Sequence, residues 1–143
     1  MAFDALELTG RARTHVIDLD APRCTLHRAV AQPFLRMRAA AAQAGIDLVA
    51  ASSFRDFERQ RAIWNGKWSG ERPLVDRAGR PLDAARLTDG ERVSAILAWS
   101  AVPGTSRHHW GTDLDVYDRA AVPADYRLQL VPAEYAPDGP FAR

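Results

Sequence analysis

The chain has almost no cysteine, no long apolar run and almost no net charge, and each shortage excludes a class of protein. Of its 143 residues only Cys24 is a cysteine, so no disulfide can form within the chain. The N-terminus lacks the basic start and apolar core of a secretory signal, and no window reaches the length of a membrane span. A formal net charge of +1 gives no electrostatic basis for binding nucleic acid or an anionic membrane.

The composition that is present is typical of a globular domain. Apolar residues make up 47% of the chain and charged residues 26%, and the length suits a single domain over residues 1–143. As written, the chain is expected to stay in the cytoplasm, whereas removal of a leader would place it in the periplasm or cell wall. The sequence carries no signal for an oligomeric state.

The first half of the chain predicts an irregular lead followed by a long helix. Residues 1–24 predict an irregular lead with one short strand. From Leu26 onward, apolar residues recur at steps of three and four, which is typical of an amphipathic helix. Thr25 is expected to cap this helix and Gly45 to end it, with Pro33 either kinking the helix or marking its true start.

The middle of the chain predicts one strand, two helices and a hairpin. The apolar run at residues 46–52 indicates a buried strand, and Asp56 or Ser53 is expected to cap the helix after it. Glycine, proline and scattered charges over residues 67–87 favour a long loop or short hairpin. Thr88-Asp-Gly-Glu91 has the pattern of a capping box and predicts a third helix.

Two more strands are expected after this helix, at residues 112–117 and, more weakly, at residues 126–131. Three helices and three or four strands with no repeating βαβ order predict an α+β fold. In such a fold the helices pack on a small, mostly antiparallel sheet.

Metal-binding chemistry is concentrated in the stretch at residues 103–118. Alternation in the predicted strand makes Asp113 and Asp115 face the same way, and Gly111 lets the preceding loop fold back toward them. His108 then becomes a candidate to approach these carboxylates. Imidazole nitrogen and carboxylate oxygen suit zinc, and a catalytic zinc takes three protein ligands and a water. Taken alone, a His-His pair in a loop is more often a surface or hydrogen-bonded pair than a metal site.

The spacing of this stretch resembles a known zinc-peptidase signature. Ser106-x-His108-x-x-Gly111-x-Asp113-x-Asp115 is similar to the SxHxxGxAxD signature of the zinc D-alanyl-D-alanine carboxypeptidase and dipeptidase family (M15), which includes the vancomycin-resistance peptidases. The resemblance implies that His108 and Asp115 are zinc ligands and that Ser106 anchors the loop or reaches substrate. Asp113 departs from the alanine of the signature. Three interpretations of Asp113 stay open: a surface residue, the mark of a divergent subgroup, or a residue that hydrogen-bonds to a metal ligand without binding the metal. His109 is a candidate for the same supporting role.

A second segment, SSFRDFERQ at residues 52–60, is similar to the SGYRxxxxQ segment of the same family. The resemblance implies that Arg55 and Gln60 bind substrate and that Arg55 also stabilises the tetrahedral intermediate. A guanidinium group can donate two charge-assisted hydrogen bonds to an oxyanion or carboxylate, which agrees with that role. Without the resemblance, an arginine near a helix start is usually a solvated charge.

The resemblance covers about residues 25–141 and implies a Hedgehog/DD-peptidase-like fold. The implied activity is zinc-dependent hydrolysis of peptidoglycan-type peptides through a metal-activated water. The Glu-x-x-His motif that gives the family its general base and third ligand does not occur here, so we expect a C-terminally truncated domain. The alternatives are a non-catalytic zinc- or cell-wall-binding domain, or a structural domain that binds no metal.

Overall fold

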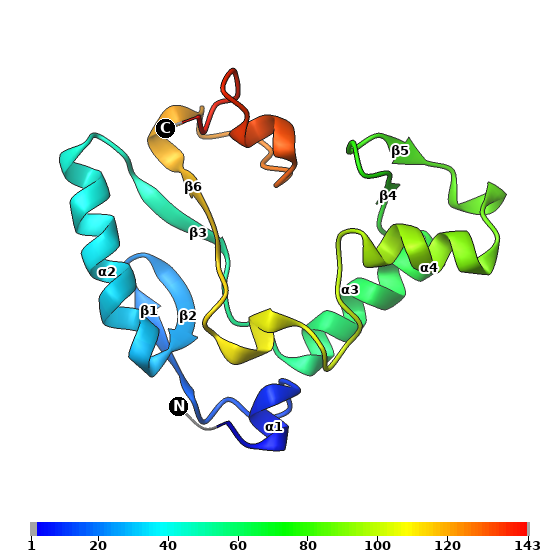
Figure 1. Cartoon of the computed structure of the whole chain (residues 1–143), viewed down its shortest axis with the longest axis horizontal. Helices are drawn as coiled ribbons and strands as arrows, with labels where there is room; N and C mark the ends of the chain where they lie inside the picture. The colour runs from blue at the N-terminus through cyan, green and yellow to red at the C-terminus, as the bar shows by residue number, and fades with distance from the viewer. Residues whose placement is uncertain (1–2, 143) are drawn as a thin grey trace. The chain divides into compact units, whose positions relative to one another are not determined.

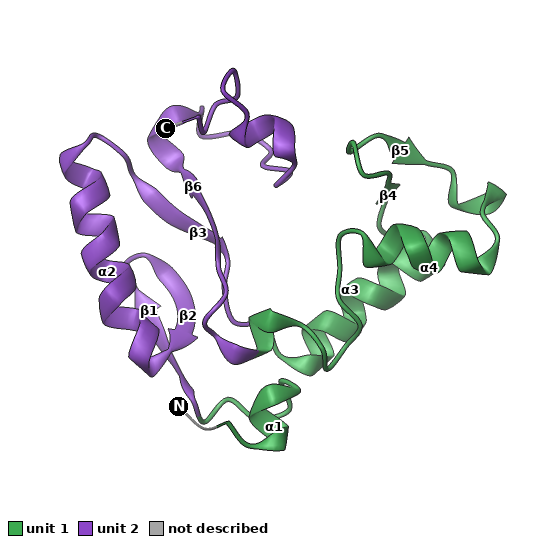
Figure 2. Ribbon diagram, viewed as in Figure 1, with its two compact units in different colours: residues 1–14, 55–109 green, residues 15–54, 110–143 purple. Residues whose placement is uncertain are grey.

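The computed structural model describes residues 3–142 and divides them into two compact units (Figure 2). Unit 1 is formed by residues 3–14 and 55–109, and unit 2 by residues 15–54 and 110–142. Each unit therefore combines two stretches that are distant in the sequence. The single domain expected over residues 1–143 stays a prediction, since compact units of this kind also occur within one domain.

Unit 1 consists mainly of helices. It contains α1 (Ala5–Leu8), α3 (Phe57–Ser69), β4 (Leu74–Val75), β5 (Pro81–Leu82) and α4 (Asp89–Leu97), with a 3₁₀ turn at Ala84–Arg86. Another 3₁₀ turn, Arg107–Trp110, begins in unit 1 and ends at the first residue of the next stretch of unit 2. α3 packs against α4, whose Ile96 is fully buried. β4 and β5 pair as a short antiparallel hairpin, which confirms the expectation for this stretch of turn residues.

The helices of unit 1 begin at side-chain caps that the sequence encodes. Asp56 accepts a hydrogen bond from the Arg59 N–H at 2.7 Å and starts α3. Thr88 and Glu91 form the predicted capping box of α4, since each side chain accepts the backbone N–H of the other residue. A similar box starts α1, so the lead that was expected to be irregular contains a helical turn.

Unit 2 is built from two antiparallel strand pairs and one long helix (Figure 1). Its elements are β1 (Val16–Asp20), β2 (Arg23–His27), α2 (Arg28–Gln43), β3 (Leu48–Ser52) and β6 (Asp115–Asp118), with 3₁₀ turns at Arg119–Ala121 and Pro132–Tyr135. β1 pairs with β2, and β3 pairs with β6. α2 contacts β1, β2 and β3, and buried Cys24, Leu26 and Phe34 form the centre of the core.

The start of α2 differs from the prediction. Leu26 and Thr25 belong to β2, so a helix beginning at Leu26 with a Thr25 cap is wrong. Leu26 is fully buried within the β1–β2 hairpin. Because Leu26 also fits the helical spacing of the apolar residues after it, the sequence pattern assigned it to the helix instead of to β2. The cap is instead His27, whose Nδ1 accepts the Ala29 N–H at 3.1 Å. Pro33 lies inside the helix.

The single thiol is part of the core of unit 2. Cys24 is buried, and burial raises the pKa of its thiol, although the charge of Arg38 opposes this rise. A thiol with a raised pKa carries little thiolate and is a poor nucleophile. Cys24 is therefore a packing residue.

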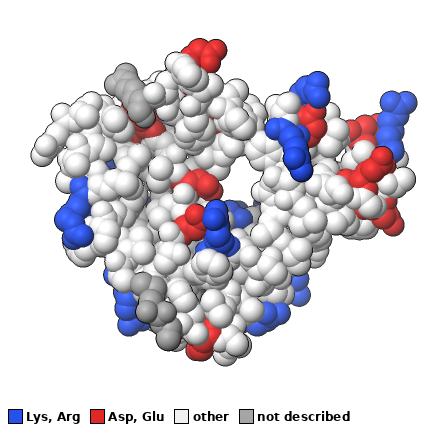
Figure 3. Space-filling model, viewed as in Figure 1, with Lys and Arg blue, Asp and Glu red and all other residues white. Residues whose placement is uncertain are grey.

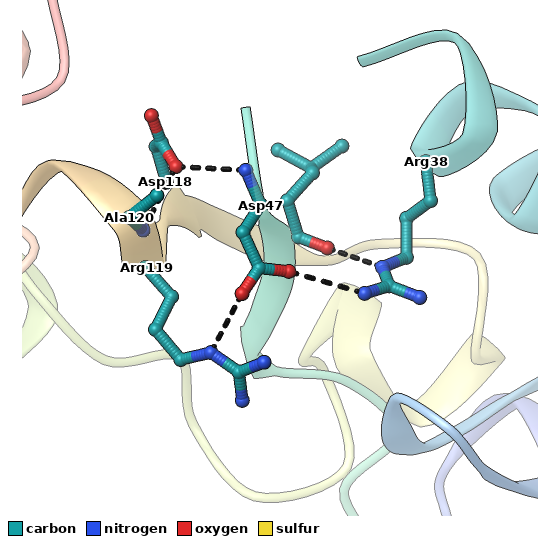
Figure 4. A network of polar contacts seen from close by, with 6 residues as sticks. Arg38, Asp47, Asp118, Arg119 and Ala120 are labelled. Carbon is teal, nitrogen blue, oxygen red and sulfur yellow. Dashed lines mark hydrogen bonds and ion pairs between the residues drawn. The ribbon is translucent and has the colours of Figure 1, made fainter. Parts of the chain in front are cut away.

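An ion-pair network joins three elements of unit 2 (Figure 4). Asp47 accepts from Arg38 Nη2 at 3.2 Å and from Arg119 Nε at 2.8 Å. The N–H of Asp47 donates to Asp118 Oδ1 at 2.9 Å. The network therefore fixes the entry of β3 between α2 and the end of β6, and so helps to set the β3–β6 register.

The C-terminal segment does not form the expected strand at residues 126–131. The N–H groups of Gln129 and Val131 donate to the Glu134 carboxylate at 3.1 and 3.2 Å. Leu130, between them, has a φ of 58°, which a strand does not allow. The prediction was wrong because backbone N–H groups of this segment bind the buried Glu134 carboxylate instead of a neighbouring strand. Alternation of polar and apolar residues does not predict such a partner.

Helices combined with small antiparallel sheets confirm the α+β class. Among residues 3–142 the strands form three separate two-stranded sheets, β4–β5 in unit 1 and β1–β2 and β3–β6 in unit 2. Acidic and basic side chains are interspersed on the face shown in Figure 3, as the small net charge suggests. Within residues 3–142, no helix has the length and apolar character needed to cross a membrane.

Candidate functional site

The first part of the site is the turn that carries Arg55, which lies in the sequence between the end of β3 and the start of α3. Its guanidinium Nη1 donates to Gln60 Oε1 at 2.8 Å, and Gln60 Nε2 donates to the Ala101 carbonyl at 2.6 Å. Gln60 is completely buried. The structure therefore joins the two residues that the second motif singled out, and Gln60 holds the arginine in place.

The main chain of Arg55 is bound to the histidine pair. The Arg55 N–H donates to the His108 carbonyl at 3.1 Å. The Arg55 carbonyl lies 2.6 Å from His109 Nδ1. Within unit 1, the predicted arginine and the backbone of the predicted ligand His108 are thus in direct contact.

His109 has 0% exposure and is a neutral imidazole. Its Nε2 accepts the Gly104 N–H at 3.1 Å, so the ring proton must be on Nδ1, which donates to the Arg55 carbonyl. Burial lowers the pKa of His109, and the positive charge of Arg55 acts in the same direction. The hydrogen bond to Arg55 and the charge of Asp56 oppose this shift without overcoming it.

Ser106 shapes the loop that carries the histidines. It is buried, and its Oγ accepts the His108 N–H at 3.3 Å. Its carbonyl accepts the His109 N–H at 3.0 Å. The sequence left two roles open for Ser106, anchoring the loop or contacting substrate. These hydrogen bonds agree with the first role, and contact with substrate stays a prediction.

In unit 2 the aspartates of the signature lie in different surroundings. Asp115 is the first residue of β6, and its Oδ2 accepts a short hydrogen bond from Ser52 Oγ. Ser52 lies opposite Asp115 where the β3–β6 register shifts. Asp113 precedes β6, because the strand begins at Asp115 rather than at Thr112, so the two aspartates do not share a strand face as predicted.

Gly111 behaves as the sequence requires. Its φ is 67°, and a Cβ at this position would lie 2.6 Å from Val16 Cγ1 and 2.7 Å from the backbone nitrogen of His27. Its carbonyl accepts the His27 N–H at 2.8 Å. Only glycine fits this approach, so the positive φ expected of Gly111 is confirmed, while the approach of His108 to the aspartates stays a prediction.

The predicted zinc ligands belong to different units, His108 to unit 1 and Asp115 to unit 2. Their pairing therefore stays a prediction. Across residues 3–142, no group of three or more His, Cys, Asp or Glu side chains is arranged to hold a metal ion. The donor types suit zinc, but the two residues supply fewer ligands than the three of a catalytic site.

Sequence reasoning missed Ser52 and Lys67. Ser52 is the first residue of the arginine motif, which was the available signal for it. Lys67 on α3 is half-buried and donates from Nζ to Ser100 Oγ at 2.8 Å. Burial lowers the pKa of Lys67, as do the charges of Arg72 and Arg55, so a second cation lies within the electrostatic field of Arg55.

Glu134 is a glutamate of the C-terminal segment that no histidine follows in the sequence. It is 6% exposed and accepts from the Tyr126 hydroxyl at 2.8 Å. Burial by itself would raise the pKa of Glu134, but hydrogen bonds from the Gln129 N–H, the Tyr126 hydroxyl and the Val131 N–H outweigh it and lower the pKa. A carboxylate with these partners organises its own segment and is unsuited to act as a general base.

The fold is that of the VanY D,D-peptidases. Two solved structures resemble it: a mutant of the vancomycin-resistance D,D-pentapeptidase VanY from a VanB-type resistance cassette in complex with Zn(II), at a TM-score of 0.57, and VanYB in complex with D-alanine-D-alanine, at 0.58. Both are 22% identical to this chain and match 75% and 76% of it. The chain spans about half the length of these proteins, 53% and 54%.

The family of the chain is shown by a match that covers most of its sequence. A model of the VanY family, described as D-alanyl-D-alanine carboxypeptidase, matches residues 23–134. The chain therefore belongs to this family, which confirms the suspected resemblance. Two uncharacterised proteins of Haemophilus influenzae also match. One is 44% identical over 98 residues, which is 66% of this chain and 67% of the relative, and the other is 45% identical over 40 residues, or 28% and 30%.

Proposed function

We propose that this chain supplies the arginine and two zinc ligands of a D-alanyl-D-alanine carboxypeptidase that hydrolyses peptidoglycan-derived peptides. The observation that carries the proposal is the binding of the Arg55 main chain to the His108 carbonyl and the His109 ring. This contact links the two motifs that resemble the family, and it supports the proposal because the proposed oxyanion-binding residue lies next to the backbone of a proposed metal ligand.

Arg55 is proposed to bind the substrate and the developing oxyanion. Its guanidinium is oriented by Gln60, which is fully buried and hydrogen-bonded at both ends of its amide. Gln60 is therefore proposed to act through Arg55. The resemblance implies instead that Gln60 itself binds substrate, and that contact stays a prediction. A preorganised donor of this kind typically contributes about 10²- to 10³-fold in kcat.

His108 and Asp115 are proposed to hold zinc. Ser52 orients the Asp115 carboxylate, and such outer hydrogen bonds fix the direction of a ligand. When bound, zinc would polarise the scissile carbonyl and lower the pKa of a water molecule. We propose that the third ligand and the general base are supplied outside these 143 residues.

The test is release of D-alanine from a peptide that ends in D-Ala-D-Ala, with zinc present and after chelation. The matched substrate ends in D-Ala-L-Ala. We expect zinc-dependent release from the first peptide only, in a protein that includes the missing ligand and base, and a loss of about 10²-fold or more in kcat for Arg55→Ala. Equal release from both peptides, or full activity of Arg55→Ala, would contradict the proposal.

A second candidate is a non-catalytic zinc- or cell-wall-binding domain. It is favoured by one observation, namely that the Glu-x-x-His motif, which gives the family its general base and third ligand, does not occur in these 143 residues. Zinc binding and retention of the D-Ala-D-Ala peptide without any release of D-alanine, in the natural full-length protein, would select this candidate.

A further inference from the structure

The ring of His109 is enclosed by three segments of unit 1. Arg55 contributes its carbonyl, at 2.6 Å from Nδ1, and Gly104 contributes its N–H, at 3.1 Å from Nε2. The backbone of Gly10 packs directly against the ring, because a Cβ at this position would lie 2.4 Å from Nδ1 and 2.7 Å from Cγ of His109. The ring is thus in contact with the lead segment, the arginine turn and the loop before the predicted ligand.

The two hydrogen bonds of this ring have fixed directions. A backbone N–H can only donate and a carbonyl can only accept, so Gly104 and Arg55 together require a neutral ring with its proton on Nδ1. The ring therefore connects the Gly104 loop to the Arg55 carbonyl. Because the His108 carbonyl binds the Arg55 N–H, the arginine backbone is held on both sides.

The lead segment takes part in this arrangement although it lies outside the matched residues 23–134. The Gly10 carbonyl accepts the N–H of Phe57, the first residue of α3, at 2.9 Å. The guanidinium of Arg11 lies over the Phe57 ring, 3.8 Å from its centroid. These contacts fix Gly10 against α3 and the imidazole against Gly10.

We propose that His109 is a positioning residue for Arg55, and that Gly10 of the lead segment provides the surface against which its ring is seated. This inference rests on the proposed function, because it assigns His109 an effect on activity through Arg55. His109 need not touch substrate or metal. It sets where the Arg55 backbone lies, and an error of about 1 Å in such a group can cost about 10²-fold in rate.

Two substitutions separate the two hydrogen bonds. The Nδ2 of asparagine occupies the place of Nδ1, so His109→Asn keeps the donor to Arg55, whereas the Oε1 of glutamine replaces Nε2, so His109→Gln keeps only the acceptor for Gly104. We expect His109→Gln to lower kcat by about 10- to 100-fold with a smaller change in KM. His109→Asn should recover most of this loss. Equal kcat values in the two variants at equal zinc content and melting temperature would overturn the inference.

The role of Gly10 is tested by a pair of glycines. Gly10 and Gly70 both have positive φ, at 72° and 84°, but a Cβ on Gly70 meets no atom within 4 Å. Gly10→Ala and Gly70→Ala therefore carry similar backbone strain, and only the first displaces the His109 ring. We expect Gly10→Ala to reproduce the kcat loss of His109→Gln while Gly70→Ala keeps wild-type kcat. Similar kcat in both glycine variants would contradict the role of Gly10.

A spectroscopic measurement keeps this inference distinct from the proposed function. In the full chain, the backbone amide resonance of Arg55 should shift in His109→Gln and return toward its wild-type position in His109→Asn. An unshifted resonance in His109→Gln overturns the inference whatever the activity. Conversely, a shifted resonance in a protein whose Arg55→Ala variant keeps full activity would overturn the proposed role of Arg55 and leave the positioning by His109 established. If Arg55 does matter, His109→Gln should have no further effect on kcat in an Arg55→Ala background.

Discussion

Several polar side chains of the candidate site are fixed by partners that leave them one orientation. Gln60 uses its amide oxygen for Arg55 and its amide nitrogen for Ala101, and the His109 ring uses both nitrogens. A buried polar group lowers the stability of the fold unless it is hydrogen-bonded. Each of these side chains therefore needs its hydrogen-bond partners, and these partners in turn fix its orientation. The consequence is a preorganised arginine, which is what stabilisation of an oxyanion needs.

Ser52→Ala should weaken zinc binding. The hydroxyl of Ser52 donates to Asp115 Oδ2, and removing such a partner of a metal ligand typically costs about 10- to 100-fold in affinity. Zinc titration against a competing chelator measures this change. The matched control is Ser53→Ala, because the Ser53 hydroxyl accepts the Thr25 N–H instead. The same zinc affinity in both variants would show that Ser52 does not support a ligand.

Glu134→Gln should destabilise unit 2 in a pH-dependent manner. The pKa of Glu134 is lowered in the folded state, so its ionised form stabilises the fold above about pH 5, and this contribution is lost as the pH falls through the folded-state pKa. We expect a cost of about 1–3 kcal/mol at pH 7, since the buried partners lose a charged acceptor. Urea unfolding at pH 7 and at low pH measures it, and the difference from wild type should shrink in acid.

Glu58→Gln is the control for this experiment. The Glu58 side chain is 66% exposed and pairs with Arg61 on the helix surface, where an ion pair contributes little. Its substitution should leave the unfolding midpoint nearly unchanged at both pH values. A Glu134→Gln effect that is equally small, or that grows in acid, would contradict the role assigned to Glu134.

Among the elements, those with local signals could be predicted and those with distant partners could not. Asp56, the Thr88–Glu91 box and Gly45 act within a few residues of the sequence, and each is found as expected, with Gly45 at a φ of 75° just after α2. The helix predicted from Leu26 failed because pairing with β1 decides that segment. The expected C-terminal strand failed because Glu134 captures its N–H groups.

Thr88→Ala should destabilise α4. The substitution removes the side-chain acceptor for the Glu91 N–H and one half of the capping box, which typically costs about 0.5–2 kcal/mol. Amide hydrogen exchange in α4 measures the loss as faster exchange. Thr88→Ser keeps the hydroxyl and should exchange at nearly the wild-type rate. If both variants exchange alike, the capping box is not what stabilises the start of α4.

For the molecule as a whole, the two motifs were visible in the sequence but their support was not. Residues 52–60 and 106–115 carry the family resemblance, and the family is confirmed. The roles of Gly10 and Gly104 depend on contacts with His109 from distant or irregular segments, which no spacing rule reveals. The chain spans about half the length of the solved VanY structures it resembles.

The most direct measurement is the zinc content after equilibrium dialysis of a protein that includes the proposed third ligand, compared among wild type, His108→Ala and Asp115→Ala. Asp125→Ala, which removes an exposed carboxylate elsewhere, is the control. The account predicts one zinc per chain in wild type and Asp125→Ala, and loss of that zinc in both ligand variants. Unchanged zinc content in His108→Ala would contradict it.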